Sequence, residues 1–263
     1  MFKDIKEYVK EENAKIKEAI DRKRYQPKLL IMQVGDNEAS NRYVRNKMRD
    51  CAEVGIFAET RKFPDVFNFS FLGLTSAIVD KQDDYDGVMV QLPLPGYDPA
   101  QVNHVLNAID PDKDVDGLGK HTDITPCTAR GIMDYLRYCE YDFTGKHVVV
   151  IGRSELVGRP LAKLLIDADA TVTLCHSKTK NLFDYISDAD LIICAVGKAN
   201  FLNCYPIHCP VVDVGTNFVD GKLVGDCFNT ENREVTPVPG GVGLLTRLAL
   251  LKNICDVAGI KYE

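Results

Sequence analysis

The chain has 263 residues, of which 45% are hydrophobic and 27% charged, a composition typical of a globular protein with about two ordinary-sized domains. A formal net charge of −6 disfavours nucleic acid or an anionic membrane as the main partner. No apolar run reaches the roughly twenty residues of a membrane span, and the N-terminal residues lack the apolar core of a secretory signal. We therefore expect a cytoplasmic protein.

The first part of the chain alternates between helical and strand patterns. Apolar residues recur at helical spacing within residues 3–24, which predicts an amphipathic helix. The elements expected after it are a strand at 28–34, a helix from Asn37 or Ser40 to Val54, a strand at 57–63, a helix at 69–80 and a strand at 87–92. This alternation predicts an α/β domain with an open parallel sheet.

The second part of the chain repeats the α/β pattern after an acidic, turn-rich segment at 110–118, which we interpret as a linker. The elements expected there are strands at 147–151, 171–175, 191–196 and 211–214 and a helix at 159–165. A last apolar helix, at 245–253, is expected to pack back on the first domain. The predicted domains are therefore 1–118 with 244–263, and 119–243.

The segment Gly152-Arg-Ser-Glu-Leu-Val-Gly158 joins a buried strand to a helix, as in a turn that cradles a dinucleotide pyrophosphate. It departs from G-x-G-x-x-G because Ser154 stands at the second glycine. The next strand ends in His176-Ser-Lys178, where an NAD site would place Asp or Glu. Ser177 and the cation Lys178, with Arg153 as a second cation, suit a 2′-phosphate, so NADP is favoured over NAD. A solvated turn with incidental charges is the alternative.

A second group of polar residues falls in the first domain. Tyr43 and Lys47 are four residues apart and share one face of a predicted helix. Gln91 lies at the carboxyl end of a predicted strand, where open α/β sheets place ligand-binding groups. The three side chains are candidates for one catalytic cleft. Taken singly, a Tyr–Lys pair at this spacing is more often part of a solvated helix face, and a Gln at a strand end more often contacts loop backbone.

Two turn-forming segments carry further candidates. Asp116 lies in the acidic segment, which lacks the spacing of a calcium loop. Its carboxylate is suited to accept paired N–H groups of a heterocycle, or it belongs to a solvated turn. The segment Pro237-Val-Pro-Gly-Gly-Val-Gly243 predicts a stiff turn before the last helix. That turn is either close to cofactor and substrate or a hinge between domains.

Nine cysteines raise the question of a metal site or of disulfides. None of them forms a C-x-x-C pair, and Cys204 and Cys209, which flank His208, have no second ligand cluster at zinc-type spacing. Cys175 and Cys194 lie in strand-like runs, where a free cysteine behaves as a small hydrophobe. We expect reduced thiols and no bound metal.

Together these segments resemble the bifunctional methylenetetrahydrofolate dehydrogenase/methenyltetrahydrofolate cyclohydrolase family. The matches span most of the chain and occur in the family's order. They are Ser40-x-x-Tyr-Val-x-x-Lys47 with Gly55-Ile56, Val90-Gln-Leu-Pro-Leu-Pro95, Asp110-Pro-x-Lys-Asp-Val-Asp-Gly-Leu118, Thr125-Pro-Cys-Thr128, Gly152-Arg-Ser-x-x-Val-Gly158, Cys175-His-Ser-Lys-Thr179, Val212-Asp-Val-Gly215, Gly221-Lys-Leu-Val-Gly-Asp226 and Thr236-Pro-Val-Pro-Gly-Gly-Val-Gly243.

The resemblance implies NADP-dependent oxidation of methylenetetrahydrofolate and hydrolysis of the methenyl product. It implies two α/β domains with a folate cleft between them, a Rossmann-type NADP domain at the C-terminal side, and a homodimer formed through that domain. By resemblance, Lys47 is the principal group of the hydrolysis, Gln91 assists it, Tyr43 stacks on the aminobenzoate ring and Asp116 holds the pterin. The other substrate-binding residues implied are Leu92, Pro239, Gly240 and Gly241. The implied cofactor-binding residues are Gly152, Arg153, Ser154, Val157, Gly158, His176, Ser177, Val196, Gly197, Gly215 and Thr216.

The chain departs from the family pattern at a few positions near the expected ligands. Leu244-Leu245 stand where the family usually has Pro-Met, Ala129 replaces a proline, and Thr216 replaces an apolar residue. These departures leave open a catalytically silent folate- or dinucleotide-binding protein. A third hypothesis, an NADP oxidoreductase of another substrate such as a shikimate-type dehydrogenase, leaves Gln91 and Asp116 without a role.

Overall fold

The computed structural model describes residues 1–64, 70–227 and 234–262. Contacts divide the chain into two compact units. Unit 1 comprises residues 1–10 and 128–246, and unit 2 comprises residues 11–127 and 247–263. The helices α1 (Ile5–Lys23) and α8 (Val242–Val257) are divided between the units, and Cys127, the first residue of α5 (Cys127–Tyr138), belongs to unit 2. None of the described helices is long and apolar enough to cross a bilayer.

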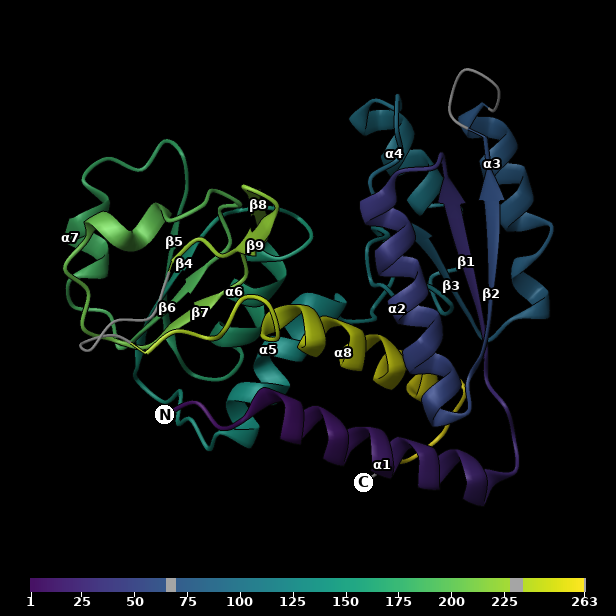
Figure 1. The fold of residues 1–263 in the computed structure, drawn as a ribbon, viewed down its shortest axis with the longest axis horizontal. Coiled ribbons are helices and arrows are strands. Elements are labelled where there is room, and N and C mark those ends of the chain that lie inside the picture. The colour runs from purple at the N-terminus through teal and green to yellow at the C-terminus, as the bar shows by residue number, and fades with distance from the viewer. Residues whose placement is uncertain (65–69, 228–233, 263) are drawn as a thin grey trace. The chain divides into compact units, whose positions relative to one another are not determined.

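Unit 2 is built on a parallel sheet of three strands in the order β2-β1-β3 (Figure 1). Its strands are β1 (Lys28–Val34), β2 (Phe57–Phe63) and β3 (Gly87–Gln91). Its helices, besides its parts of α1 and α8, are α2 (Glu38–Val54), α3 (Phe71–Val79), the short 3-10 helix η1 (Gln82–Asp84) and α4 (Pro99–Leu106).

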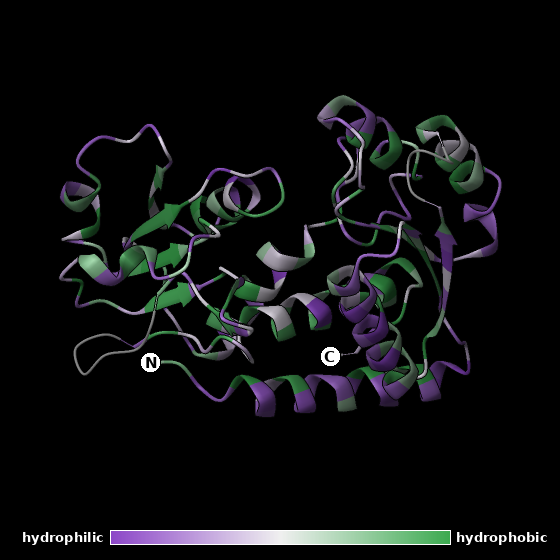
Figure 2. Ribbon diagram, turned by 45° about the horizontal axis from the view of Figure 1, so that its top comes forward, coloured by the Kyte–Doolittle hydropathy of each residue, from purple (hydrophilic) through white to green (hydrophobic). Residues whose placement is uncertain are grey.

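The two faces of this sheet have different neighbours because side chains alternate along each strand. Val88 and Val90 of β3 join a buried cluster with residues of α3 and α4. Met89 and Gln91 therefore point to the opposite face, where the Lys47 side chain of α2 contacts both. The edge strand β2 is mostly half-exposed and hydrophilic, as the purple arrow of this sheet in Figure 2 shows.

Unit 1 contains a parallel sheet of four strands in the order β5-β4-β6-β7 and a short antiparallel hairpin, β8-β9. The strands are β4 (His147–Ile151), β5 (Thr171–Cys175), β6 (Leu191–Cys194), β7 (Val211–Asp213), β8 (Asn217–Val219) and β9 (Lys222–Val224). The helices, besides its parts of α1 and α8, are α5 (Cys127–Tyr138), α6 (Gly158–Ile166), α7 (Leu182–Ile186) and the 3-10 helix η2 (Phe201–Cys204). Figure 2 shows strands of this sheet as apolar, in keeping with their burial.

The strand order of unit 1 reverses at β4. The chain runs from β4 outward to β5 on one side and then returns to place β6 and β7 on the other. In open α/β sheets such a reversal opens a crevice at the carboxyl ends of the strands, where ligands bind. The predicted phosphate-binding turn, 152–158, follows β4 at this position.

The predicted α/β architecture is confirmed, and each predicted strand is present with ends shifted by a few residues at most. The first residue of the helix predicted at 69–80 lies outside the described residues, and the described helix is α3. The prediction of a linker at 110–118 is wrong. Asp114 and Val115 are buried, and Val88 N–H donates to Lys113 O at 2.8 Å, so the segment is paired to the edge of the unit 2 sheet.

Candidate active site and cofactor cavity

Lys47 and Gln91 meet on the α2 face of the unit 2 sheet. Lys47 Nζ donates to Gln91 Oε1 at 3.3 Å and contacts Met89 Sδ at 3.5 Å. Both Lys47 and Gln91 are only 8% exposed. Since a buried amino group requires polar partners, this contact is a built polar site, and the alternative that Lys47 lies on a solvated helix face is wrong.

Helix α2 places Lys47 on its buried side. The Asn37 side chain caps its start by accepting from Ser40 N–H at 3.1 Å, and Gly55 ends it with a left-handed backbone at φ 93°. Between these caps, Val44, Lys47 and Cys51 lie on one buried stripe. Tyr43, by contrast, is 44% exposed, so its ring is available to stack on a ligand.

The Gln91 side chain is held by the backbone of the next residue. Its Nε2 donates to Leu92 O at 2.6 Å, which turns Oε1 toward Lys47. A cis peptide bond follows between Leu92 and Pro93. The amide therefore acts as a neutral acceptor at the lysine, and it adds no charge to the site.

Asp116 lies in a turn that its neighbour Asp114 organises. The Asp114 carboxylate accepts from Gly117 N–H at 3.2 Å and from Gly119 N–H at 2.6 Å and is almost fully buried. Burial raises the pKa of Asp114 to about 6, and the nearby Asp116 charge adds to the effect. Asp116 itself is half-buried. Among the residues that the structure describes, no donor reaches its carboxylate, so those oxygens are open to a ligand.

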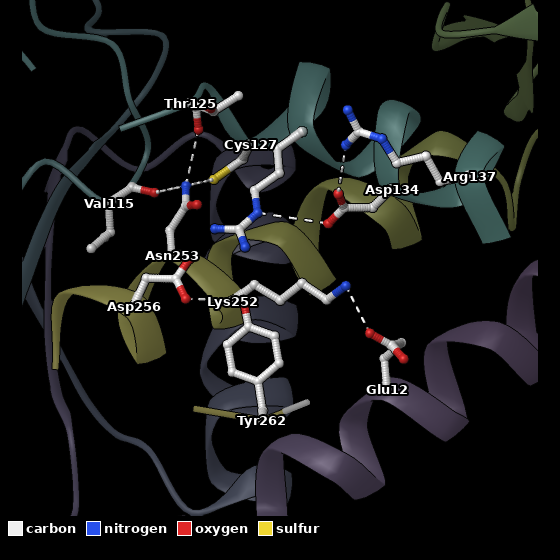
Figure 3. A network of polar contacts seen from close by, with 11 residues as sticks. Glu12, Val115, Thr125, Cys127, Asp134, Arg137, Lys252, Asn253, Asp256 and Tyr262 are labelled. Carbon is white, nitrogen blue, oxygen red and sulfur yellow. Dashed lines mark hydrogen bonds and ion pairs between the residues drawn. The ribbon is translucent and has the colours of Figure 1, made fainter. Parts of the chain in front are cut away.

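The ends of the segment that carries Asp116 are fastened by Asn253 of α8 (Figure 3). Asn253 Nδ2 donates to Val115 O at 2.8 Å and to Thr125 O at 3.1 Å. Cys127 joins them, since its Sγ lies 3.2 Å from Val115 O and its N–H donates to Asp116 O at 3.3 Å. Asn253 is 1% exposed. It fixes a turn 138 residues away in sequence, and the sequence interpretation missed it.

Unit 1 contains a cavity of about 560 Å³ at the carboxyl ends of β4, β5 and β6. Of the predicted cofactor residues, it brings together Gly152, Arg153, His176, Ser177 and Val196. The other lining residues were missed by sequence reasoning; they are Ile151, Thr179, Leu182, Ala195, Lys198, Phe201 and Tyr205. The described lining contains the cations Arg153 and Lys198 and no carboxylate.

Close backbone packing explains both glycines of the predicted turn. A Cβ on Gly152 would lie 2.3 Å from Ala195 O, and one on Gly158 would lie 1.9 Å from Gly152 O. Ser154, at the expected second glycine, accepts from Val157 N–H at 3.2 Å and so helps to start α6. Ser154, Val157 and Gly158 therefore shape the turn, but among the described residues they do not line the cavity as Gly152 does.

The turn after β5 presents Ser177 to the cavity. His176 N–H donates to Thr179 Oγ1 at 2.9 Å, and Lys178 N–H donates to His176 Nδ1 at 3.1 Å. Ser177 and Lys178 are exposed at the tip of the turn. The arrangement leaves a hydroxyl and a nearby cation free to bind an anion.

The remaining predicted residues lie outside the described cavity lining. Gly197 and Gly215 lie in the loops after β6 and β7, and Thr216 is exposed. In the Pro-Gly-Gly segment of unit 1, a cis bond joins Val238 to Pro239, Gly240 has a φ of 97°, and a Cβ on Gly241 would lie 2.2 Å from Pro237 O. These glycines are required by the turn itself. No group of side chains suited to a metal ion occurs in the described part of the chain.

Comparisons with known proteins identify the family. Residues 1–116 match the model of the tetrahydrofolate dehydrogenase/cyclohydrolase catalytic domain, and residues 126–262 match that of the NAD(P)-binding domain. The bifunctional protein FolD of Streptococcus suis is 42% identical over 259 residues, covering 92% of this chain and 90% of that protein.

Solved structures give the same relationship. The bifunctional dehydrogenase/cyclohydrolase of Campylobacter jejuni superposes with a TM-score of 0.90 at 36% identity, covering 97% of each chain. The Trypanosoma brucei enzyme, solved with NADP cofactor and inhibitor, superposes with a TM-score of 0.86 at 31% identity, covering 98% of this chain and 96% of that one. This chain belongs to the tetrahydrofolate dehydrogenase/cyclohydrolase family.

Proposed function

We propose that this chain oxidises 5,10-methylenetetrahydrofolate with NADP and hydrolyses the resulting 5,10-methenyltetrahydrofolate to 10-formyltetrahydrofolate. The observation that carries the proposal is the pairing of two distinct sites in one chain of this family. One is the buried contact between Lys47 and Gln91, and the other is the cation-lined cavity with its glycine turn.

The cavity residues fit NADP. The turn at Gly152 packs so closely on Ala195 O that it has no room for a Cβ, and Arg153 and Ser177, which line the same cavity, offer a cation and a hydroxyl for a 2′-phosphate. Because the described lining residues include no carboxylate, none of them would repel that phosphate. When bound, the nicotinamide accepts a hydride and supplies the redox chemistry. The protein then needs to bind and orient the reactants, and it needs no strong base, because the methenyl cation is resonance-stabilised.

We assign the hydrolysis to Lys47. Water adds to the methenyl carbon and loses a proton, which leaves a hydroxyl on that carbon. As the bond from the carbon to N5 breaks, the hydroxyl loses its second proton and becomes the formyl oxygen, and N5 takes up a proton, so one proton is released overall. Lys47 is the group that moves these protons, as a general base and then as an acid. Gln91 Oε1 accepts from Lys47 Nζ and holds it in place without adding charge. A neutral lysine is the form suited to this step, because an ammonium would repel the substrate cation.

We assign folate binding to Tyr43, Asp116 and the residues beside them. The exposed Tyr43 ring offers a stacking surface one helical turn from Lys47. The open Asp116 carboxylate suits the amino and ring N–H groups of the pterin. The other proposed substrate contacts are Leu92 and the loop at Pro239, Gly240 and Gly241. The other proposed cofactor contacts are Val157, Gly197, Gly215 and Thr216. We also propose a cytoplasmic homodimer, on the family resemblance.

The test is a pair of initial-rate assays on the purified chain. One supplies methylenetetrahydrofolate with NADP or with NAD, and the other follows the loss of methenyltetrahydrofolate absorbance against buffer alone. Faster oxidation with NADP and accelerated methenyl loss are expected. If both activities are absent while folate and NADP still bind, the chain is a silent binding protein, and Thr216 and Leu244 become the first residues to revert.

A further inference from the structure

Two aspartates of unit 1 are fully buried behind the cofactor cavity. Asp213 ends β7, and Asp226 follows the hairpin strand β9; each is 0% exposed. Neither residue lines the described cavity. Because an ionised carboxylate is costly to bury without donors, the contacts of these two side chains reveal what each of them holds in place.

The Asp226 carboxylate binds three consecutive amides of the loop after β6. Its Oδ2 accepts from Val196 N–H at 2.8 Å and from Gly197 N–H at 2.9 Å. Its Oδ1 accepts from Lys198 N–H at 2.7 Å and from Asn217 Nδ2 at 3.1 Å. Val196 and Lys198 line the cavity. One buried carboxyl group therefore fixes the backbone of a cavity wall.

Asp213 in turn fixes Asp226. Its Oδ1 accepts from the backbone N–H of Asp226 at 3.0 Å and of Gly215 at 2.9 Å, and its Oδ2 accepts from Cys227 N–H at 2.9 Å. The packing leaves no space for side chains beside the carboxylates. A Cβ on Gly215 would lie 2.1 Å from Asp226 Oδ1, and one on Gly225 would lie 1.9 Å from Asp213 Oδ2.

We propose that Asp226 is a positioning residue of the dehydrogenase reaction, acting through the backbone of residues 196–198 on the wall of the NADP cavity. The inference rests on the function proposed above. It predicts that loss of the Asp226 carboxyl group harms NADP-dependent oxidation and leaves hydrolysis intact, because Lys47 and Gln91 belong to unit 2. Asp226 does not line the cavity, so its effect is on the geometry of the wall.

Asp226→Asn is the decisive substitution. An asparagine keeps the shape but turns an NH₂ group toward a backbone N–H on one side, because both carboxylate oxygens accept backbone donors in the native protein. We expect KM for NADP to rise at least about tenfold, a change of about 1.4 kcal/mol. We expect the cyclohydrolase rate, measured without NADP, to stay within about twofold of the wild-type rate.

Asp190→Asn is the matched control. Asp190 Oδ2 also accepts a backbone N–H, that of His147 at 2.8 Å, but it does so at the amino end of β4, the end of the strand away from Gly152. In this variant the asparagine oxygen can still accept from His147 N–H, and the NH₂ group replaces the oxygen that contacts Lys146 Nζ at 3.4 Å, so the same substitution is made in the same unit away from the cavity. It should lower the unfolding temperature while leaving KM for NADP within about twofold of the wild-type value.

The outcomes separate the possibilities. If Asp226→Asn leaves both kcat and KM for NADP unchanged, or if it lowers oxidation and hydrolysis in parallel, the positioning role is overturned. A wild-type chain without NADP-dependent oxidation refutes the proposed function instead.

If Asp226→Asn does not fold, hydrogen exchange of the wild-type protein decides. The amides of residues 196–198 should be protected against exchange in the ligand-free enzyme, because a buried carboxylate binds them. Exchange of these amides as fast as that of exposed loop amides would overturn the proposal.

Discussion

Lys47 and Gln91 lie on two different elements, α2 and β3, and are joined by a hydrogen bond of 3.3 Å between Nζ and Oε1. Each side chain is 8% exposed. The amide is held by a second bond of 2.6 Å, from Gln91 Nε2 to Leu92 O, so its oxygen faces the lysine. The chemistry assigned to Lys47 depends on this arrangement.

Replacement of Lys47 by methionine removes the ammonium and keeps the apolar stem on Met89. Because general acid–base catalysis contributes about 10²- to 10⁴-fold, we expect the cyclohydrolase rate to fall at least about 100-fold while NADP binding remains. Two quantities are measured: the rate of methenyltetrahydrofolate loss and, by titration, the affinity for NADP. Arg45→Ala, at an exposed position of the same helix, is the control and should have no effect. Unchanged hydrolysis in Lys47→Met would remove the lysine from the mechanism.

Ser177→Asp places an anion in the cavity beside the proposed 2′-phosphate site. We expect KM for NADP to rise at least about tenfold and KM for NAD to change much less, because like charges in contact are strongly unfavourable. Ser177→Ala serves as the uncharged control, with a smaller loss for NADP. Equal effects of Ser177→Asp on the two cofactors would refute the assignment of Ser177 to the 2′-phosphate.

Asp116→Ala should weaken folate binding by about 1.5–3 kcal/mol, the range for hydrogen bonds to a charged group. The measurement is the dissociation constant for a tetrahydrofolate derivative in the absence of NADP. Asp112→Ala, an exposed carboxylate of the same segment, should leave that constant unchanged. Equal affinities of Asp116→Ala and wild type would show that Asp116 forms only part of a turn.

Asp114 predicts a pH dependence of stability. Burial raises its pKa to about 6 in the folded protein, above the value of about 3.9 expected when unfolded. The folded state therefore binds the proton more tightly, and the stabilisation from protonation is lost as pH rises from about 4 to about 6. We therefore compare the free energies of unfolding of the wild type and of Asp114→Asn, and we expect the wild-type value minus the variant value to fall over this pH interval. A constant difference in urea titrations across it would contradict the shift.

The sequence predicts the α/β architecture well because strand and helix periodicities are local. It also contains a signal for α4, since Asp98-Pro-Ala-Gln101 is a capping-box pattern, and the structure shows that box formed. The burial of Asp114 was not predictable in this way. An acidic, turn-rich segment is typical of solvent-exposed chain, and only the sheet edge at Val88 shows that this one is buried.

The candidate site was predictable where its residues fall in recognisable motifs. Tyr43 and Lys47 share a helix, yet their spacing does not reveal that Lys47 is buried and Tyr43 exposed. That distinction depends on β3, where Gln91, which contacts Lys47, lies 44 residues further along the chain. Asp226 and Asn253 were not predictable, because both act through backbone groups that tertiary packing alone brings to them.

The central claim is that one chain carries out both reactions in sequence. The most direct measurement supplies methylenetetrahydrofolate and NADP to the purified protein and quantifies the methenyl and 10-formyl products over time. We predict that 10-formyltetrahydrofolate forms with NADPH in equal amounts, faster than methenyltetrahydrofolate hydrolyses in buffer. NADPH formation with methenyltetrahydrofolate accumulating, and decaying only at the buffer rate, would contradict the claim and leave a dehydrogenase alone.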